Sequence, residues 1–422
     1  MSETAVTGKR AVPTATQALV LPSSIVLILA LMAGGLSLDR LSESFSGLGA
    51  PGEVRFVGLV VVALLLCLSV LVRLPKSPVS SSTNGWILAI VVVHCWVMLS
   101  WIWSDRSDFA SQQLYELTLL LGTFVVSSTI FRRQPRRLVL LLFAVFGLLA
   151  LGFCALSLVL LGGMSGALSV VGAGGIGSAR LLGVGVLVSL FWFLRTQRVR
   201  FLLPVPLFLA GMMLSGSRAS ILALAVSGLA LWLSRKWIVG PEQRLSALPV
   251  IIAVATGVVT LAVILATQIG RQMVTNFLLS NFVADSASAS GAGLYLADRN
   301  VIFGAALTEF RDHLVAGSGL GTYLGPFGEL YPHNLALNFA VDGGVLGLIG
   351  FLVVLYWPMQ RIVRSRDSLA LGALVTGLFF LVASLFAGTY YDARFLWVFL
   401  MLGMLCVDQP GVKLRDNKML PE

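Results

Sequence analysis

The chain has 422 residues, of which 57% are hydrophobic and 11% are charged, and its mean hydropathy is +0.93. This composition excludes a water-soluble fold, because so few ionic side chains cannot cover the surface of such an apolar chain. The formal net charge of +10 does not indicate nucleic-acid binding, because Lys and Arg stand in short clusters between apolar runs, as in cytoplasmic loops of membrane proteins.

The apolar runs are continuous stretches of Leu, Val, Ala and Phe, which predict helices that cross a membrane. The predicted fold class is therefore all-α: a polytopic integral membrane protein with about 12 transmembrane helices. We expect the spans at residues 18–38, 54–72, 85–103, 109–131, 138–161, 180–194, 200–214, 218–234, 247–268, 334–357, 368–388 and 390–407.

The basic residues predict how the chain is oriented. With the N-terminus in the cytoplasm, the inner segments hold 20 of the 29 Lys and Arg residues, as the positive-inside rule requires. No cleavable signal peptide is expected, because a long span follows Lys9 and Arg10. The predicted organisation is a cytoplasmic tail (1–17), spans one to nine (18–268), a periplasmic loop with the active-site residues (269–333), spans ten to twelve (334–407) and a second cytoplasmic tail (408–422).

The long loop between spans nine and ten calls for a function, because structureless loops of this length are uncommon. Its small-residue stretch SASASGAG at 286–293 is followed by Asp298, which we expect to cap a helix. Residues Arg299, Phe303, Ala306 and Phe310 recur at helical spacing on one face. The loop is thus predicted to contain an amphipathic helix that lies on the membrane or covers the bundle.

Two arginines contradict the charge bias and need a separate reason to lie on the outer side. Arg218 follows Ser215 and Ser217 in a short turn, so it is predicted to occupy the first turn of a helix capped by one of these serines. An Arg beside a helix N-terminus makes a site for a phosphate. Arg299 is expected to repeat the arrangement. The alternative is that each arginine simply lies at the level of the lipid headgroups or in solvent.

The three histidines have different predicted roles. His333 precedes the tenth span, where the helix dipole keeps it neutral near pH 7 and able to accept a proton. His94 lies in the middle of a span and is predicted to be a packed, hydrogen-bonded core residue. His313 is predicted to be solvated. Their positions at different membrane depths argue against a shared metal site, and no metal ligand set is predicted.

Several other polar residues carry weaker signals. Asp105 and Asp108 could hold a divalent ion, but two carboxylates in a short loop are more often solvated. Glu116 lies inside the fourth span, where an ionisable group needs a partner or a polar cavity, and Arg180 or Arg394 could pair with it. Glycines 317, 319, 321 and 325 are read as a turn region rather than a phosphate loop, because no strand precedes them.

Four stretches together resemble a known family: SGSRAS at 215–220, DRNVIFGAAL at 298–307, HLVAGSGLGTY at 313–323 and PHNLALNFAVDGGVLGLIGFL at 332–352. They are similar to the signature region of the bacterial O-antigen ligase and polymerase superfamily. The resemblance implies a glycosyltransferase of the bacterial inner membrane that uses a glycan on undecaprenyl diphosphate at the periplasmic face, with no metal and no cofactor.

The resemblance also implies roles for single residues. It assigns binding of the diphosphate to Arg218 and Arg299 and catalysis to His333, the same three residues that the sequence singles out on physical grounds. The family's Asn-containing stretch near the sixth span is missing after Arg180, which leaves the role of Arg180 open.

Residues with an expected supporting role are Ser217, Asn334, Glu116 and Arg180.

The leading hypothesis is an O-antigen ligase that joins the glycan to lipid A-core in a single, inverting displacement. The alternative is a polymerase of the same superfamily, which extends a lipid-linked glycan. A transporter or flippase of lipid-linked glycan is a third reading, but it gives no reason for a histidine beside the long outer loop. The expected partners are the lipid-linked donor, the lipid A-core or glycan acceptor and membrane lipid; nucleic acid is not expected.

Overall fold

The computed structural model describes residues 80–105, 107–160, 175–215, 217–239 and 292–409. All regular elements within these ranges are helical, so the predicted all-α class is confirmed there. In chain order they are α4 (Ser81–Leu99), η1 (Ser100–Ile102), α5 (Asp108–Ile130), η2 (Phe131–Arg133), α6 (Pro135–Leu160), α7 (Gly175–Thr196), η4 (Val199–Phe201), α8 (Val205–Leu214), α9 (Arg218–Leu233), α10 (Arg235–Ile238), α13 (Ala292–Asp312), α14 (Leu335–Ser365), α15 (Ser368–Phe386), η6 (Tyr391–Ala393) and α16 (Arg394–Asp408).

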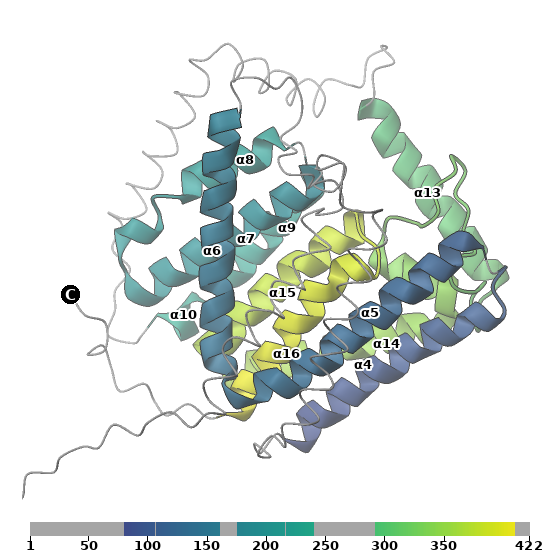
Figure 1. The fold of residues 1–422 in the computed structure, drawn as a ribbon, viewed down its shortest axis with the longest axis horizontal. Coiled ribbons are helices and arrows are strands. Elements are labelled where there is room, and N and C mark those ends of the chain that lie inside the picture. Colours follow the sequence, from purple (N-terminus) through teal and green to yellow (C-terminus); the bar gives the residue numbers. More distant parts are fainter. Residues whose placement is uncertain (1–79, 106, 161–174, 216, 240–291, 410–422) are drawn as a thin grey trace, which may run out of the picture.

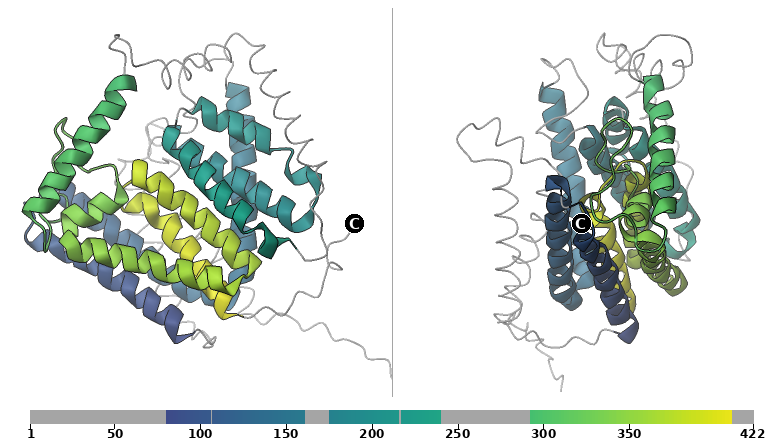
Figure 2. Two further views of the ribbon diagram at one scale, coloured as in Figure 1. Left: turned by 180° about the vertical axis from the view of Figure 1, so that it is seen from behind. Right: turned by 90° about the vertical axis from the view of Figure 1, so that its right-hand side faces the viewer.

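The helices form one bundle with two distinct ends (Figures 1 and 2). Helices α4, α5, α14, α15 and α16 run side by side, and α13 lies across one end of this group. We call this end the α13 end. The short helix α10 lies at the opposite end, which we call the α10 end.

Five helical segments in the described ranges are long and apolar enough to cross a membrane: Ser81–Ile102, Pro135–Ala155, Ile176–Thr196, Leu335–Ser365 and Ser368–Phe386. Helix α5 is more polar in its first turns, where Gln112, Gln113 and Glu116 stand, and α16 has only 15 residues. The first, second and ninth expected spans lie outside the described residues, so the total of twelve stays a prediction.

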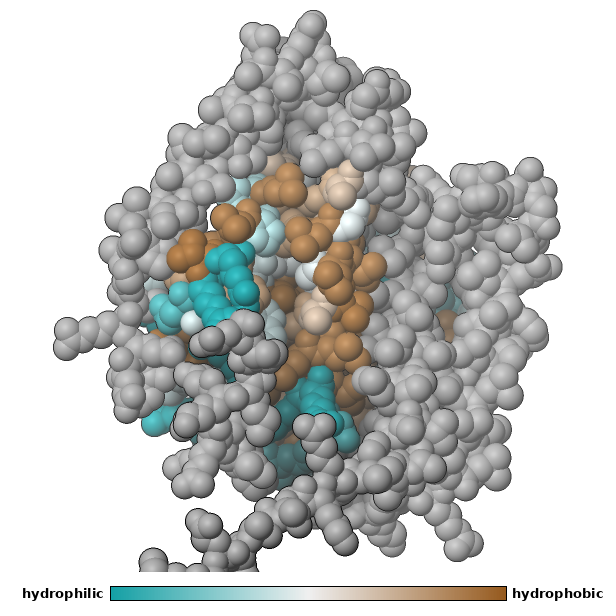
Figure 3. Space-filling view, turned by 60° about the vertical axis from the view of Figure 1, so that its left-hand side comes forward, coloured by the Kyte–Doolittle hydropathy of each residue, from teal (hydrophilic) through white to brown (hydrophobic). Residues whose placement is uncertain are grey.

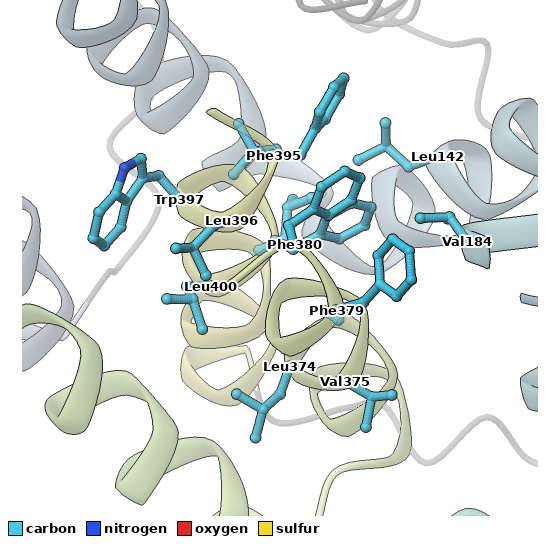
Figure 4. Packing of buried hydrophobic residues seen from close by; sticks show 14 of the residues in the cluster. Leu142, Val184, Leu374, Val375, Phe379, Phe380, Phe395, Leu396, Trp397 and Leu400 are labelled. Atoms are coloured by element: carbon cyan, nitrogen blue, oxygen red, sulfur yellow. The ribbon is translucent and has the colours of Figure 1, made fainter. Parts of the chain in front are cut away.

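The centre of the bundle is aromatic. Helices α15 and α16 pack against each other through Phe380 and Phe395, whose stacked ring centroids are 5.1 Å apart, and Phe146 of α6 meets Phe395 edge to face at 5.4 Å. Figure 4 shows Phe380 and Phe395 on these two helices, with Phe379 directed toward Val184 of α7. Gly183 lets α7 approach α15 closely, since a Cβ at this position would lie 2.5 Å from the Phe379 ring of α15. Aromatic packing of this kind fixes the relative positions of α6, α7, α15 and α16.

Helix α14 contains a proline, and another helix completes its hydrogen bonds. Pro358 has no N–H, so it leaves the carbonyl of Val354, four residues earlier, without its intrahelical donor. The indole Nε1 of Trp86 in α4 donates to this carbonyl at 2.7 Å. A bare carbonyl in an apolar environment is costly, so this bond both repairs α14 and fastens it to α4.

Near its start, α14 is interrupted at Gly344, whose φ of 66° and ψ of −159° are not helical. The two groups that would bond each other in an unbroken helix take other partners. The N–H of Val345 donates to the carbonyl of Leu314 at 2.8 Å, and the carbonyl of Val341 accepts from the N–H of Ser318 at 2.8 Å. The segment 314–318 therefore fills the break, as expected for irregular backbone at membrane depth.

The glycine-rich turn after α13 is bound into the same break. Gly317, Gly319 and Gly321 all have positive φ, and a Cβ on Gly317 would lie 2.5 Å from the backbone of Asp342. The Asp342 carboxylate accepts a hydrogen bond from the Tyr390 hydroxyl at 2.8 Å and another from the backbone of Gly321. The turn predicted from sequence is thus a tightly packed turn that joins α13, α14 and the segment after α15.

Candidate active site

His333 lies at the α13 end, directly before α14. Its backbone has a φ of 53°, which a residue with a side chain adopts at a cost. Asn334, predicted to support the site, caps α14: its side chain accepts from the N–H of Leu337 at 3.1 Å. The cap fixes where α14 begins and thereby holds His333 at a strained position just outside the helix.

The surroundings of His333 favour its neutral form. Burial lowers the pKa of His333 below the ordinary value of 6.5, and the positive charge of Arg299 lowers this pKa further, while the carboxylates of Glu329 and Asp392 oppose the shift. A neutral imidazole near pH 7 can accept a proton. The same interactions show that the structure brings Arg299, Glu329 and Asp392 into electrostatic range of His333.

An aromatic pair holds His333 on one side. The ring centroids of Tyr331 and His333 are 4.2 Å apart, and the Tyr331 ring is stacked at 6.4 Å and 14° on Phe109 in the first turn of α5. Tyr331 also interacts electrostatically with Arg180. The loop before α14 is therefore positioned by contacts with both α5 and α7.

Arg180 takes a definite place in this arrangement. Its guanidinium donates to the carbonyl of Ala387 and lies 3.5 Å from the carboxylate of Asp392. Asp392 also accepts from the N–H of Thr389 at 3.0 Å. Arg180 is 9% exposed, so the ion pair is largely shielded and fastens the turn after α15 to α7. The pairing with Asp392 was not predicted, although an acidic residue in a short outer loop was a visible signal.

Arg218 is the first residue of α9, as predicted, and is half-buried. Ser217 occupies the N-cap position, but its side chain does not cap the helix. Its hydroxyl instead pairs with the Ser220 hydroxyl at 2.9 Å, and Ser215 donates to the carbonyl of Met212 at 2.6 Å. The predicted position of Arg218 is right, while the predicted serine cap is wrong because nearer acceptors engage both hydroxyls.

Arg299 lies in a different part of its helix than predicted. Helix α13 begins at Ala292, so Asp298 is not an N-cap and Arg299 is about two turns inside the helix. The residues between Ala292 and Asp298 include no proline, and nothing stops the helix from extending backwards. Arg299 therefore does not lie at a helix N-terminus, and the helix dipole gives no reason for a phosphate there. What Arg299 does contribute is the positive charge of its guanidinium near His333.

One face of α13 is packed against the loop and helix that follow it, while Val301 and Leu307 are exposed, so the apolar residues are not confined to a single face. Ile302 and Ala306 form a small core with Tyr323 and Val341, and Phe303 and Phe310 pack against it. The Tyr323 hydroxyl donates to the carbonyl of Ile302 at 3.0 Å. Burial, followed by the nearby carboxylates of Glu329 and Glu309, raises the pKa of Tyr323 to about 12, so this hydroxyl stays protonated.

Other candidate residues have local partners. Glu116 is half-buried on α5 and accepts from the Gln112 side chain at 3.2 Å. Asp105 accepts from the N–H of Ser107 at 3.3 Å. His94 is buried and bonded to the carbonyl of Ile90 at 2.9 Å, as predicted for a core residue, and His313 is exposed, also as predicted. In the described ranges, no three His, Cys, Asp or Glu residues gather in a way that could hold a metal ion.

Comparison with known proteins identifies a family that part of the chain matches. Residues 203–352 match the model of the family described as O-antigen ligase, and the matched segment contains Arg218, Arg299 and His333. No curated protein matches the chain. The match and the apolar helices together point to a multi-pass membrane protein, and the matched family is one of ligases and polymerases that resemble membrane glycosyltransferases. The resemblance of this chain to the O-antigen ligase superfamily is thereby confirmed, over residues 203–352.

Proposed function

We propose that this chain is an O-antigen ligase, which transfers a glycan from undecaprenyl diphosphate to lipid A-core. The observation that carries the proposal is the pairing of a neutral histidine, His333, with a cation, Arg299, inside the segment that matches the family. Glycan transfer from a diphosphate needs both groups, because an acceptor hydroxyl must lose a proton while negative charge develops on the leaving diphosphate.

In the proposed reaction, an acceptor hydroxyl oxygen attacks the anomeric carbon of the donor glycan. The new bond to carbon forms as the bond from that carbon to the diphosphate oxygen breaks, and undecaprenyl diphosphate leaves with the bonding electron pair. The imidazole of His333 takes the hydroxyl proton. Arg218 and Arg299 bind the diphosphate and stabilise its developing charge. A single displacement of this kind inverts the anomeric centre.

The supporting residues act through position. Asn334 fixes the start of α14 beside His333, and Arg180 anchors the turn after α15 through Ala387 and Asp392. Ser217 lies at the start of α9 next to Arg218. Glu116 is proposed to line a polar cavity with its carboxylate, which lies half-buried on α5. None of these residues is proposed to transfer a proton.

The reaction is proposed to take place at the periplasmic face of the bacterial inner membrane. The charge distribution of the sequence supports this orientation, with most Lys and Arg in segments expected to be cytoplasmic. In that orientation the α13 end faces the periplasm, where a lipid-linked donor and lipid A-core could both reach His333. The reaction is proposed to need no metal ion.

A lipopolysaccharide gel of a deletion strain tests the assignment. Loss of the ligase leaves core with no glycan repeat. A polymerase would use the same donor chemistry with a different acceptor, and its loss leaves core that carries one repeat only. Complementation with the His333→Ala variant should reproduce the deletion, whereas normal lipopolysaccharide in the deletion strain would contradict both functions.

A further inference from the structure

Four basic residues from different helices gather at the α10 end, far from His333. Arg136 stands in the first turn of α6, Arg195 in the last turn of α7, Lys236 in α10, and Arg366 in the left-handed turn that ends α14. We call these four residues the basic cluster. Arg136 and Arg195 lie near Asp367, the N-cap of α15, and Arg366 directly precedes it in the chain.

Contacts across helices hold the basic cluster together. Arg136 forms an ion pair with Asp367, and Arg195 lies in electrostatic range of both. The Trp237 ring connects the other two members: the Lys236 Nζ lies 4.7 Å and the Arg366 Cζ 5.8 Å from its centroid. Helix α10 packs against both α7 and α15. These contacts form two pairs of cations, Arg136 with Arg195 and Lys236 with Arg366, and the packing of α10 brings the two pairs to the same end of the bundle.

Asp367 cannot neutralise the cluster. Its Oδ1 accepts from the N–H groups of Leu369 and Ala370, at 3.1 and 2.9 Å, and its Oδ2 accepts from Arg136. The single carboxylate among the four basic residues is therefore already hydrogen-bonded at both oxygens, and its one negative charge cannot balance four positive ones. A surplus of positive charge at a helical junction attracts an anion.

Two guanidinium groups in the cluster also have unused donors. Arg136 Nε and Arg195 Nη1 are buried and have no hydrogen-bond partner among the residues that the structure describes. Leaving a charged donor buried and unbonded costs free energy, which an anionic acceptor with several oxygens would recover. A phosphate group is such an acceptor, and guanidinium groups bind it through two donors at once.

We propose that the basic cluster binds the phosphate of an acidic phospholipid headgroup. The cluster stands at the ends of α7 and α15, which are apolar enough to span a membrane, and its tryptophan is the residue type typical of the lipid headgroup level. The face drawn in Figure 3 shows hydrophilic residues gathered in groups beside a hydrophobic band. Basic pockets between membrane helices are known to bind anionic headgroups. This site is independent of the proposed glycan transfer.

Native mass spectrometry of the purified chain in neutral detergent tests the site, with phosphatidylglycerol and phosphatidylcholine as probes. Phosphatidylglycerol should bind and phosphatidylcholine should not. The double variant Lys236→Gln/Arg366→Gln should bind phosphatidylglycerol about 30-fold more weakly, since each basic residue near an anionic lipid contributes about fivefold. Both side chains are exposed, so the substitutions leave the core intact.

A matched control removes the same charge elsewhere. Arg137 and Arg364 are exposed residues of the first turn of α6 and the last turn of α14, so Arg137→Gln/Arg364→Gln should bind almost as tightly as the parent. An equal loss in both double variants, or equal binding of both lipids, would overturn the site. Displacement of phosphatidylglycerol by inorganic phosphate would overturn the lipid assignment. Unchanged binding in the Lys236→Gln/Arg366→Gln variant would contradict the residues named.

Discussion

The ring centroids of Tyr331 and His333 lie 4.2 Å apart. The two residues are two positions apart in sequence, and His333 has a left-handed backbone conformation directly before α14. This contact, together with the stack of Tyr331 on Phe109, restricts the orientation of the imidazole. A general base must be held in place to within a fraction of an ångström to be effective. The ring contact and the left-handed backbone of His333 together hold the imidazole in place, as its proposed role as general base requires.

Tyr331→Ala should lower kcat by about tenfold to a hundredfold, because misplacing a reacting group by about 1 Å has an effect of this size. The KM for the lipid-linked donor should change little, since the arginines proposed to bind the donor are untouched. Tyr331→Phe keeps the ring and should retain most of the activity. Steady-state transfer assays with purified protein measure both constants. A Tyr331→Ala enzyme with normal kcat would show that the ring does not position His333.

His333→Ala should reduce the rate by about 10²–10⁴, the usual contribution of a general base. Binding of the donor should persist, because it rests on the two arginines. A binding assay with undecaprenyl-diphosphate glycan separates the two effects. EDTA should leave the parent enzyme active, and inhibition by the chelator would point to a bound metal instead. Loss of binding along with activity would make His333 a positioning residue.

Arg218→Ala and Arg299→Ala should each lower transfer by at least about a hundredfold, comparable to removing one donor to a developing charge. Lysine at either position should restore part of the activity, since it keeps the charge but lacks the two-donor fork. Arg311→Ala is the control, because Arg311 is an exposed residue in the last turn of α13. Near-normal transfer by Arg218→Ala would mean that Arg218 lies at the membrane surface without a role in the reaction.

Glu329→Gln should lower the pKa of His333 further, because the Glu329 carboxylate favours the imidazolium form. The neutral form is the active one, so the acidic limb of the pH profile of kcat/KM should move to lower pH. NMR titration of labelled histidine measures the pKa directly, and the chain has only three histidines to assign. A shift to higher pH would contradict the proposed base.

Gly344→Ala should destabilise the protein by about 1–3 kcal/mol from its backbone conformation alone, because its φ of 66° and ψ of −159° lie in a region that essentially only glycine adopts. A Cβ there would also lie 2.2 Å from the carbonyl oxygen of Val315, so the segment that fills the break must move. Gly228→Ala in α9 is the control, because its Cβ would meet no atom within 4 Å, and it should leave stability unchanged or raise it by about 0.5–1 kcal/mol. Thermal unfolding in detergent compares the two. Equal melting temperatures would show that the break tolerates a side chain.

The sequence predicts the parts of this structure that depend on local chemistry. Continuous apolar runs locate most of the described helices, the turn before Arg218 lies where the sequence places it, and His94 is recognised as a core residue. The predicted start of α13 is wrong, because a residue type that often caps helices, such as Asp298, does not set the N-terminus when the preceding residues can also be helical.

Tertiary relationships escape such an analysis. Arg180 and Asp392 pair across 212 positions, and no periodicity connects them. The break in α14 has a local signal, the consecutive glycines Gly343 and Gly344, but the partners of the freed backbone groups lie in another segment. In both cases the deciding contact forms only when separate helices meet.

The bond from Trp86 to the Val354 carbonyl has a consequence for how the chain is assembled. Helix α14 cannot satisfy its own backbone at Pro358, so as an isolated segment in lipid it would carry an exposed carbonyl. The donor that covers it is synthesised 268 positions earlier, and is already in the membrane when α14 emerges from the ribosome. The backbone hydrogen bonds of α14 are therefore completed only when α14 packs against α4, after both helices have entered the membrane.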